Sequence, residues 1–258
     1  MKKHKILFFL LVLSSPLFAA IQVLNGLTHV HTTAAGGQIN GKILIKNESA
    51  KEARILIYKQ DLIANCGNAI AYTTSNTHNR SLGNWLQTNI DEKILSPNEE
   101  YTIHYTINMP KDSIGKGTYW SVLMIEGAEP IKEENTNGMQ VNSKVRYAIQ
   151  VLADVDGFES PKLTFEDVKY EAKSSKTLKV RIKNDGLCSA KTKVSIEIFS
   201  DKGVKIKGYE ATQKRIYPNL CNEFELLLDD MPKGKYEGVL IADNGKDIFG
   251  STITLDVE

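Results

Sequence analysis

Cysteine is the most reactive residue type in this sequence, and the spacing of its three copies suggests one disulfide bond. Cys188 follows a candidate strand at about 177–184, and Cys221 directly precedes another at about 222–228. Antiparallel neighbours bring the end of one strand beside the start of the next, so we expect a Cys188–Cys221 disulfide, with two unpaired thiols as the alternative. The closed loop would contribute about 3–4 kcal/mol in an oxidising compartment. Cys66 would then remain an unpaired loop thiol or pair with another molecule.

Histidine offers a second kind of chemistry. His29 and His31 lie two positions apart on a candidate strand, so their rings share a face and could hold a metal ion together. No carboxylate or Cys stands near them in the sequence, and we expect no metal site. The sequence also lacks the motifs of nucleophile elbows, zinc peptidases, phosphate-binding loops and dithiol redox centres. It therefore predicts a protein that is not an enzyme and needs no cofactor.

A polar segment at about 62–90 is the third candidate, because long loops on rigid β-sandwiches often carry recognition residues. Arg80 and Trp85 could form a contact surface there for a peptide or a glycan. In the alternative interpretation, Trp85 covers the edge of the core and Arg80 bonds loop carbonyl groups. We favour this structural interpretation, because Trp85 and Leu86 are followed by a return to the alternating strand pattern.

Strands must position all of these residues, since apolar and polar side chains alternate along most of the chain. The clearest run is Tyr101–Met109, and residues 178–182 behave in the same way. Alternation with period two places one face in a core and the other in water, as in antiparallel sheets. Each half contains about seven such short runs, which predicts an all-β chain with two tandem immunoglobulin-like antiparallel β-sandwich domains.

An internal repeat indicates two copies of one topology. The matching segments are Ile45–Asn47 with Ile182–Asn184, and Met109–Lys111 with Met231–Lys233. We therefore place the first domain at residues 20–153, with the insertion at about 62–90, and the second domain at 154–258. Tyr119 and Tyr236 each follow a Pro and a Gly at the start of a penultimate strand. This position predicts a tyrosine corner, in which the hydroxyl ties the strand to the preceding loop.

The first 19 residues have the three parts of a cleaved secretory signal peptide. Lysines at positions 2, 3 and 5 precede the apolar run Ile6–Leu13, and cleavage is expected after Ala19. No later apolar stretch reaches membrane-spanning length. We therefore expect an exported bacterial protein that does not span the membrane and is periplasmic, secreted or at the cell surface. The chain carries 32 basic and 31 acidic residues, without the basic excess that binding to nucleic acid requires.

The first half of the chain resembles a periplasmic pilus-assembly chaperone. The resemblance is carried by Lys46–Ser49, Leu95–Pro97, Tyr119–Ile125 with Glu126 and Pro130, and the alternating run Val145, Tyr147, Ile149 and Val151. A second resemblance is to a group of uncharacterised exported bacterial proteins, which share an Arg-Ser and an Asn-Trp pair before a Gly-x-Tyr-Trp-Ser strand. In this sequence the two pairs are Arg80-Ser81 and Asn84-Trp85.

The chaperone resemblance implies an immunoglobulin-like domain that binds another polypeptide along its last strand. Chaperones of that family hold the C-terminal carboxylate of a subunit with an early-strand Arg and a last-strand Lys. Here the early strand offers Thr28 and His29 and no Arg, whereas Lys144 and Arg146 stand at the start of the last strand. The sequence therefore contains candidate residues for the last-strand anchor and lacks the early-strand Arg.

Our leading hypothesis is a non-enzymatic adaptor or chaperone-like protein that binds another exported or cell-envelope protein through an open sheet edge. The residues expected to contact this partner are Lys144, Val145, Arg146, Ile149 and Val151, with Arg80 and Trp85 as further candidates. The alternative is a glycan-binding or surface-attachment module that uses the insertion at about 62–90.

Overall fold

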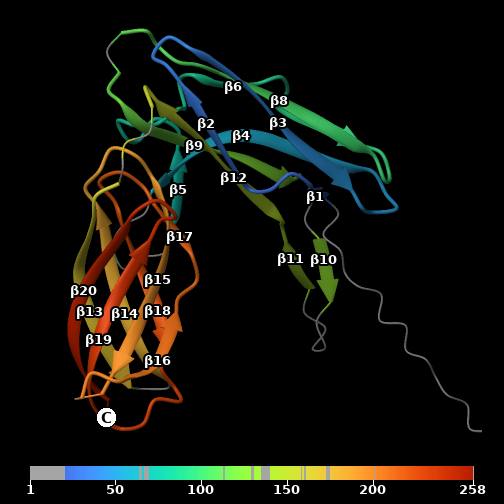
Figure 1. Ribbon diagram of the computed structural model, residues 1–258. Helices are drawn as coiled ribbons and strands as arrows, with labels where there is room; N and C mark the ends of the chain where they lie inside the picture. Colours follow the sequence, from blue (N-terminus) through green and yellow to red (C-terminus); the bar gives the residue numbers. More distant parts are fainter. Residues whose placement is uncertain are drawn as a thin grey trace, which may run out of the picture.

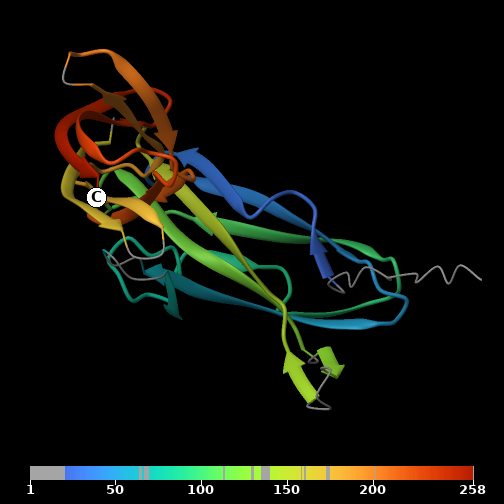
Figure 2. The same ribbon diagram turned by 90° about the horizontal axis from the view of Figure 1, so that it is seen from below.

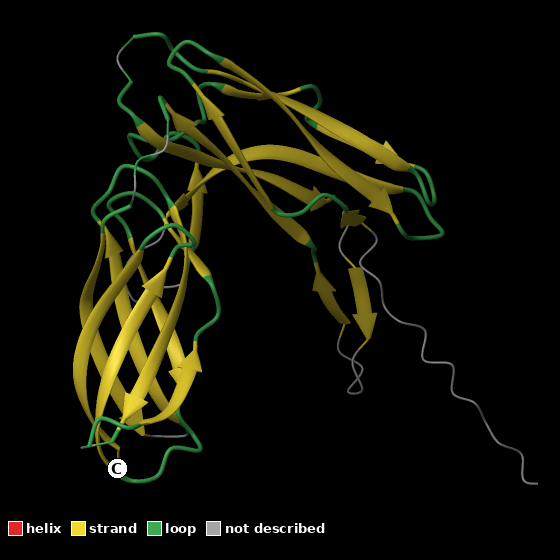
Figure 3. Cartoon of the chain, viewed as in Figure 1, coloured by secondary structure: helices red, strands yellow, loops and turns green. Residues whose placement is uncertain are grey.

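The computed structural model of the protein describes residues 21–63, 66, 70–112, 114–128, 131–134, 140–157, 159, 161–172, 175–200 and 202–257. Every regular element within these residues is a β-strand (Figures 1 and 3), which confirms the prediction of an all-β chain. In the part of the chain that is described, no helix has the length and hydropathy needed to cross a lipid bilayer. The expected signal peptide at residues 1–19 lies outside the described residues.

The first sandwich packs two sheets against each other. One sheet has the strand order β1 (Ile21–Val23), β3 (Gln38–Asn47), β8 (Glu100–Asn108) and β6 (Leu86–Thr88). The other has the order β2 (Thr28–Thr33), β12 (Arg146–Val155), β9 (Gly117–Gly127), β4 (Ala53–Ile63) and β5 (Ala71–Thr74), with β7 (Glu92–Leu95) also paired to β4. The alternating apolar side chains meet between the sheets in one core, represented by the fully buried residues Ile43, Ile103 and Leu123.

The second sandwich is built in the same way. Its smaller sheet has the order β13 (Leu163–Ala172), β14 (Lys176–Asn184) and β18 (Cys221–Leu227). Its larger sheet has the order β16 (Lys205–Glu210), β15 (Ala190–Phe199), β19 (Gly234–Asp243) and β20 (Ile248–Val257), with β17 (Lys214–Ile216) beside β15. This sandwich has its own core, which includes Val180, Ile196 and Phe224. Two sandwiches with separate cores confirm the predicted fold class.

The start of the first sandwich is divided between its two sheets. The chain pairs with β3 as β1, crosses to the facing sheet and continues as β2, which is parallel to β12. The crossing is set by Asn25, whose side chain bonds the carbonyl of Lys42 and the amide of Leu44, each at 2.9 Å. Gly26 adds a turn with φ of +86°. The alternation breaks at Val23-Leu24, and Asn25-Gly26 marks a turn in the sequence, but the pattern does not show that the chain changes sheet there.

Equivalent residues hold equivalent places in the two sandwiches, as the internal repeat predicts. Asn47 and Asn184 are both fully buried, and both donate their side-chain amide to loop carbonyl groups. Tyr119 and Tyr236 each donate their hydroxyl to the carbonyl oxygen four residues upstream, at 3.0 and 3.1 Å. Both predicted tyrosine corners are therefore confirmed.

The second sandwich is attached at one end of the first, and the two form an angled molecule (Figure 1). They meet on the outward face of the sheet that contains β9, where a third apolar cluster includes Trp120 and Tyr217. At the same junction the amide of Thr118 donates to the carbonyl of Leu187 at 2.9 Å. A Cβ at Gly117 would overlap that carbonyl, and the φ of this residue is +112°, so position 117 requires glycine.

The disulfide prediction is wrong in one partner. Cys221 is bonded to Cys66 and not to Cys188, and the two bonded residues have their Cα atoms 5.1 Å apart. The strands β14 and β18 are neighbours as expected, with Lys183 opposite Cys221, but Cys188 lies beyond this paired stretch and is buried as a free thiol. The 62–90 insertion instead carries Cys66 across to the second sandwich. The bond therefore links the two sandwiches, and Cys66 is not the unpaired thiol.

A two-stranded hairpin extends the first sandwich at the end away from the second (Figures 1 and 2). It consists of β10 (Ile131–Glu134) and β11 (Gln140–Ser143), which pair in antiparallel fashion. Because β10 follows β9 and β11 precedes β12 in the chain, the hairpin prolongs these two strands beyond the body of the sandwich.

Candidate functional site

The strand β12 has an edge that is only partly covered. On one side, β9 pairs with its whole length, from Arg146 to Val155. On the other side, β2 pairs with Gln150–Val155 alone. Among the described residues, no strand pairs with Arg146–Ile149 on that second side. An uncovered strand edge offers a row of N–H and C=O groups to another extended chain.

The backbone of β12 turns particular groups toward this open side. The carbonyl oxygen of Val145 accepts a hydrogen bond from β9 at 3.2 Å, whereas the N–H of Gln150 donates to the segment before β2 at 2.9 Å. Backbone groups alternate between the two sides along a strand. Arg146 and Ala148 therefore direct their N–H and C=O groups to the open side.

A compact group of charges lies beside the open edge. Glu126 of β9 is 7% exposed and accepts hydrogen bonds from Tyr58 at 2.7 Å, Lys144 at 3.2 Å and Arg146 at 2.8 Å. The hydrogen bond from Tyr58, together with the two cations, lowers the pKa of Glu126 against the opposing effect of burial. The carboxylate therefore stays charged and neutralises one of the two cations, so this end of β12 keeps a positive charge.

The structure divides the predicted contact residues of this strand into two groups. Lys144 and Arg146 are exposed at the open edge, and Val145 is half-buried next to them. Ile149 and Val151 have no exposed surface and belong to the core of the first sandwich. Their side chains cannot reach a partner while the sandwich is closed, and this part of the prediction is corrected. The apolar side of the alternating pattern faces the opposite sheet.

The insertion holds its two candidate residues in structural positions. Arg80 donates from Nη1 to the carbonyl oxygens of Lys116 and Thr118, both at 3.3 Å, and its guanidinium lies 5.4 Å from the ring centroid of Tyr119. Trp85 packs against the first core, with its ring 5.6 Å from that of Tyr119. These contacts support the structural interpretation of both residues rather than a glycan-binding surface.

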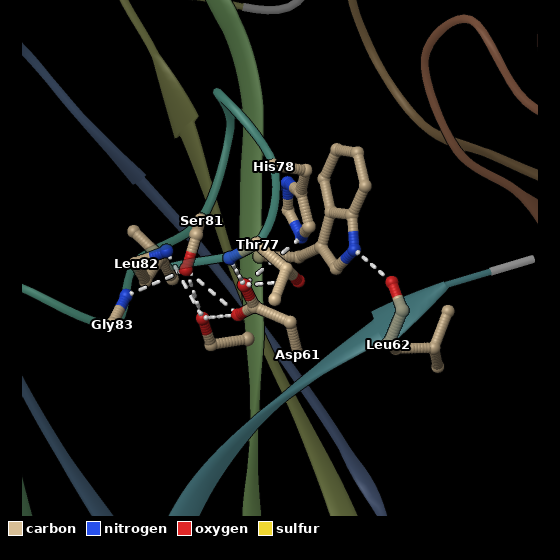
Figure 4. A network of polar contacts seen from close by, with 9 residues as sticks. Asp61, Leu62, Thr77, His78, Ser81, Leu82 and Gly83 are labelled. Atoms are coloured by element: carbon tan, nitrogen blue, oxygen red, sulfur yellow. Dashed lines mark hydrogen bonds and ion pairs between the residues drawn. The ribbon is translucent and has the colours of Figure 1, made fainter. Parts of the chain in front are cut away.

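A buried polar network attaches the insertion to the sheet (Figure 4). Asp61 has no exposed surface and accepts hydrogen bonds from Oγ of Ser81 at 2.7 Å, Oγ of Ser121 at 2.8 Å and the amide of Thr77 at 2.8 Å. These partners are separated from Asp61 by up to 60 positions in the sequence. The sequence signal for this network is an Asp inside an alternating strand. That signal does not identify the hydroxyl groups that donate to the carboxylate.

The same network does not have the order of a catalytic triad, in which a serine donates to an imidazole that donates to a carboxylate. Ser81 donates directly to Asp61, and its oxygen accepts the amide of Gly83 at 3.0 Å. His78 stacks on Trp120 with ring centroids 4.4 Å apart, and burial lowers its pKa despite the nearby carboxylate. The hydroxyl is therefore engaged in holding the loop.

A cleft of about 590 Å³ lies between β2 and the second sandwich. Its lining combines apolar side chains with cations, namely Val30, Ile70, Tyr217, Lys191, Lys214 and Arg215. Gln150 of β12 also lines it and accepts a hydrogen bond from the Tyr217 hydroxyl at 2.6 Å. The cleft therefore places positive charge of the second sandwich beside the covered half of β12, where a carboxylate could be received.

The rings of His29 and His31 are engaged by groups of the protein itself. His29 Nε2 lies 3.2 Å from the carbonyl oxygen of Gly26, and His31 Nε2 lies 2.8 Å from the hydroxyl of Tyr105. Within the described ranges, the side chains that gather as potential metal ligands are Cys66, Glu166 and Cys221. Two of these three are joined in the disulfide, so neither group supports metal binding.

Comparison with known proteins relates the chain to solved structures. No protein-family model matches it, and no curated protein matches it. A chain of the CsuC–CsuE chaperone–tip adhesion subunit pre-assembly complex, from archaic chaperone–usher Csu pili of Acinetobacter baumannii, has 12% identity and a TM-score of 0.50. The match covers 91% of this chain and 98% of that one.

Two further structures are similar at lower TM-scores. The chaperone–tip adhesin complex of CFA/I fimbriae biogenesis has 14% identity and a TM-score of 0.49, covering 93% of this chain and 99% of that chain. The class 5 fimbriae chaperone CfaA has 15% identity and a TM-score of 0.47, covering 92% and 99%. The Csu match shows that the chain has the two-domain β-sandwich fold of pilus-assembly chaperones, and the resemblance in the sequence predicts this fold for its first domain.

Proposed function

We propose that this protein is a non-enzymatic, exported, chaperone-like protein that binds an extended segment of another polypeptide by strand pairing along β12. The observation that carries the proposal is the uncovered edge at Arg146–Ile149, where Arg146 and Ala148 direct their backbone groups away from β9. A strand added there would continue the sheet and gain main-chain hydrogen bonds without rearrangement of the sandwich.

The surroundings of this edge suit an extended segment with alternating side chains. Leu24 and Leu27, in the crossing between β1 and β2, are 43% and 48% exposed, and the carbonyl of Leu27 bonds Gln150 at the end of the open stretch. An added strand could cover these leucines with apolar side chains of its own. The positive charge at Lys144 and Arg146 favours an acidic residue at the other end of the segment.

The cleft offers a second contact for the same partner. The early-strand Arg that the chaperone resemblance implies is absent, and Thr28 lies at the expected place. Lys191 and Arg215 line the cleft next to Gln150, which lies just past the open stretch of β12. We expect these cations of the second sandwich to attract a carboxylate of the bound polypeptide in place of the missing Arg.

The fold agrees with this function, because the Csu structure with the same architecture is a chaperone–tip adhesion subunit complex. From the expected signal peptide we infer a protein that is periplasmic, secreted or at the cell surface, and we therefore expect the partner to be another exported or cell-envelope protein. The buried hydroxyls of Ser81 and Ser121 both serve Asp61, which is in keeping with binding rather than catalysis.

The experiment that tests the proposal is capture of envelope proteins by two variants at one position. Ala148→Pro removes an N–H from the open side and spares the hydrogen bonds to β9, because that N–H does not face β9. Ala148→Ser changes the side chain and keeps the N–H. We expect the wild type and Ala148→Ser to retain the same partner and Ala148→Pro to lose it. Equal capture by both variants, with unchanged circular dichroism, would contradict the proposal.

A further inference from the structure

The edge strand β2 differs from its neighbours in the side chains that it directs toward the core. Its inward positions are His29, His31 and Thr33, which are half-buried, while Val30 on its outward side is 47% exposed. No residue of β2 belongs to the hydrophobic core of the first sandwich or packs against it as a partly buried apolar residue. Apolar burial therefore contributes little to holding β2 on β12.

The inward face of β2 is held instead by the side chain of Tyr105. This residue is 1% exposed, and its hydroxyl lies 2.8 Å from Nε2 of His31. Its ring meets those of His29 and His31 edge-on, at centroid distances of 6.1 and 5.9 Å. A Cβ at Gly41 would overlap the Tyr105 ring, so the ring fills the space left by that glycine. The contact between β2 and the opposite sheet is thus polar and aromatic.

Both ends of β2 are anchored to the rest of the first sandwich and not to the edge of β12 alone. Before the strand, Asn25 holds β3 through two hydrogen bonds of 2.9 Å. After it, the amide of Gly36 donates to the carbonyl of Pro110 at 2.9 Å. The six residues of β2 lie between these anchors and can therefore leave β12 while the anchored residues stay in place.

We propose that β2 is a displaceable strand that covers Gln150–Val155 at rest and is released to open the whole edge of β12, with protonation of His31 favouring release. The inference rests on the proposed function, because a longer open edge serves strand pairing with a partner. The release itself takes place within this chain and is measured without a partner.

The surroundings of the two rings explain the direction of the effect. The residues of β12 in register with them, Val151 and Ala153, are apolar and offer no counter-charge, and β8 presents the neutral phenol of Tyr105. Burial, and next the charge of His29, lower the pKa of His31 from its ordinary value of 6.5. A lowered histidine pKa leaves the paired state unaffected above pH 6.5 and weakens it as the pH falls below that value.

The carboxylates nearest to β2 are already engaged. Asp154 lies in register with Thr32 and accepts a hydrogen bond from the hydroxyl of Thr118. Asp156 accepts the amide of Ala35 at 3.0 Å. Neither carboxylate has a hydrogen bond to an imidazole, so neither directly stabilises a protonated histidine on β2.

Amide hydrogen exchange tests the release. The amides of Leu152 and Asp154 lie on the same side of β12 as that of Gln150 and face β2, whereas those of Val151 and Ala153 face β9. After correction for the intrinsic rate, we expect the first pair to exchange about threefold faster or more at about pH 5.5 than at about pH 7.5, and the second pair to change little.

The matched control is the double variant His29→Gln/His31→Gln, which keeps polar side chains that do not titrate. We expect it to lose the pH difference at Leu152 and Asp154. A wild type with the same corrected exchange at both pH values would overturn the proposal, as would a difference that persists in the double variant.

A synthetic peptide provides a second, independent readout. The probe spans residues 26–35 with leucine at both histidine positions, so it can occupy the place of β2 with an apolar inward face. We expect it to bind the wild type at about pH 5.5 and not the variant His29→Leu/His31→Leu, whose own β2 is held by apolar burial. Equal binding to both proteins would overturn displacement. Failure of Ala148→Pro to change envelope capture would instead count against the proposed function and leave the release of β2 intact.

Discussion

The indole of Trp120 lies 4.7 Å from the phenol ring of Tyr217, and this contact joins the first sandwich to the second. The indole Nε1 donates to the carbonyl of Leu62 at 3.1 Å, and the Tyr217 hydroxyl donates to the side chain of Gln150 at 2.6 Å. Both residues are nearly free of exposed surface, so their polar ends are satisfied while their rings are buried. The pair therefore fills the junction between the sandwiches, and Tyr217 also lines the cleft beside β2.

Substitutions at Trp120 and Tyr217 should separate the apolar and polar contributions of this contact to stability. Trp120→Ala removes a ring that is 4% exposed, and we expect it to lower the free energy of unfolding by about 3–5 kcal/mol. Tyr217→Phe keeps the ring and loses a hydrogen bond, at about 1 kcal/mol. Urea denaturation followed by fluorescence and circular dichroism measures both. If the two variants lose equal stability, the ring contact does not hold the junction.

The connectivity of the cysteines can be read directly. Peptide mapping without reduction should yield a linked pair that contains Cys66 and Cys221. Cys188 should resist iodoacetamide in the folded protein, because it is buried and burial raises the pKa of its thiol. After denaturation without reductant, we expect this thiol alone to be alkylated. A linked Cys188–Cys221 peptide would refute the connection between the sandwiches.

The network around Asp61 predicts which of two substitutions lowers the free energy of unfolding more. Asp61→Ala removes the shared acceptor of two buried hydroxyls and an amide, and we expect a loss of about 3–5 kcal/mol in the free energy of unfolding. Ser121→Ala removes one donor to Asp61, at about 1–2 kcal/mol. Chemical denaturation of the two variants tests this order. A native protein whose Ser81 reacts with a fluorophosphonate probe would show that the hydroxyl is not confined to this structural role.

Glu126 should govern part of the response to acid. Its folded-state pKa is lowered by Tyr58 and by the two cations, from an ordinary value of 4.5. Its contribution to stability is therefore present above pH 4.5 and is lost as the pH falls through the lowered value. We expect the melting temperature of the wild type to fall more than that of Glu126→Gln between about pH 5 and about pH 3. Equal falls in melting temperature would show that Tyr58 and the two cations do not stabilise the charged carboxylate of Glu126.

The parts of the fold that follow from sequence are those set by local pattern. Alternation identifies the strands because each buries one face, and the repeat of Asn47 at Asn184 reflects the same bonding to loop carbonyls in both sandwiches. The Pro and Gly that precede Tyr119 and Tyr236 place both tyrosine corners. Local spacing is sufficient in these cases because the partner is close in the chain.

The features that sequence did not predict depend on how the sandwiches and sheets meet. Cys66 reaches Cys221 across 155 positions, through a junction that no local spacing encodes. The open side of β12 depends on where β2 begins, and the Asn25-Gly26 turn that determines this does not show in sequence that the chain changes sheet. Alternation identifies Ile149 and Val151 as one apolar face of a strand, and the structure places that face in the closed core rather than at the open edge.

The most direct test of the central claim is site-specific photo-crosslinking in intact cells. A photoreactive amino acid is placed at Arg146 on the open edge and, in a separate variant, at Asn84 on the exposed part of the insertion. Strand pairing along β12 predicts a defined adduct with an envelope protein from position 146, absent when Ala148→Pro is present, and none from position 84. Adducts from position 84 alone would contradict strand pairing along β12 and would indicate that the partner binds the insertion.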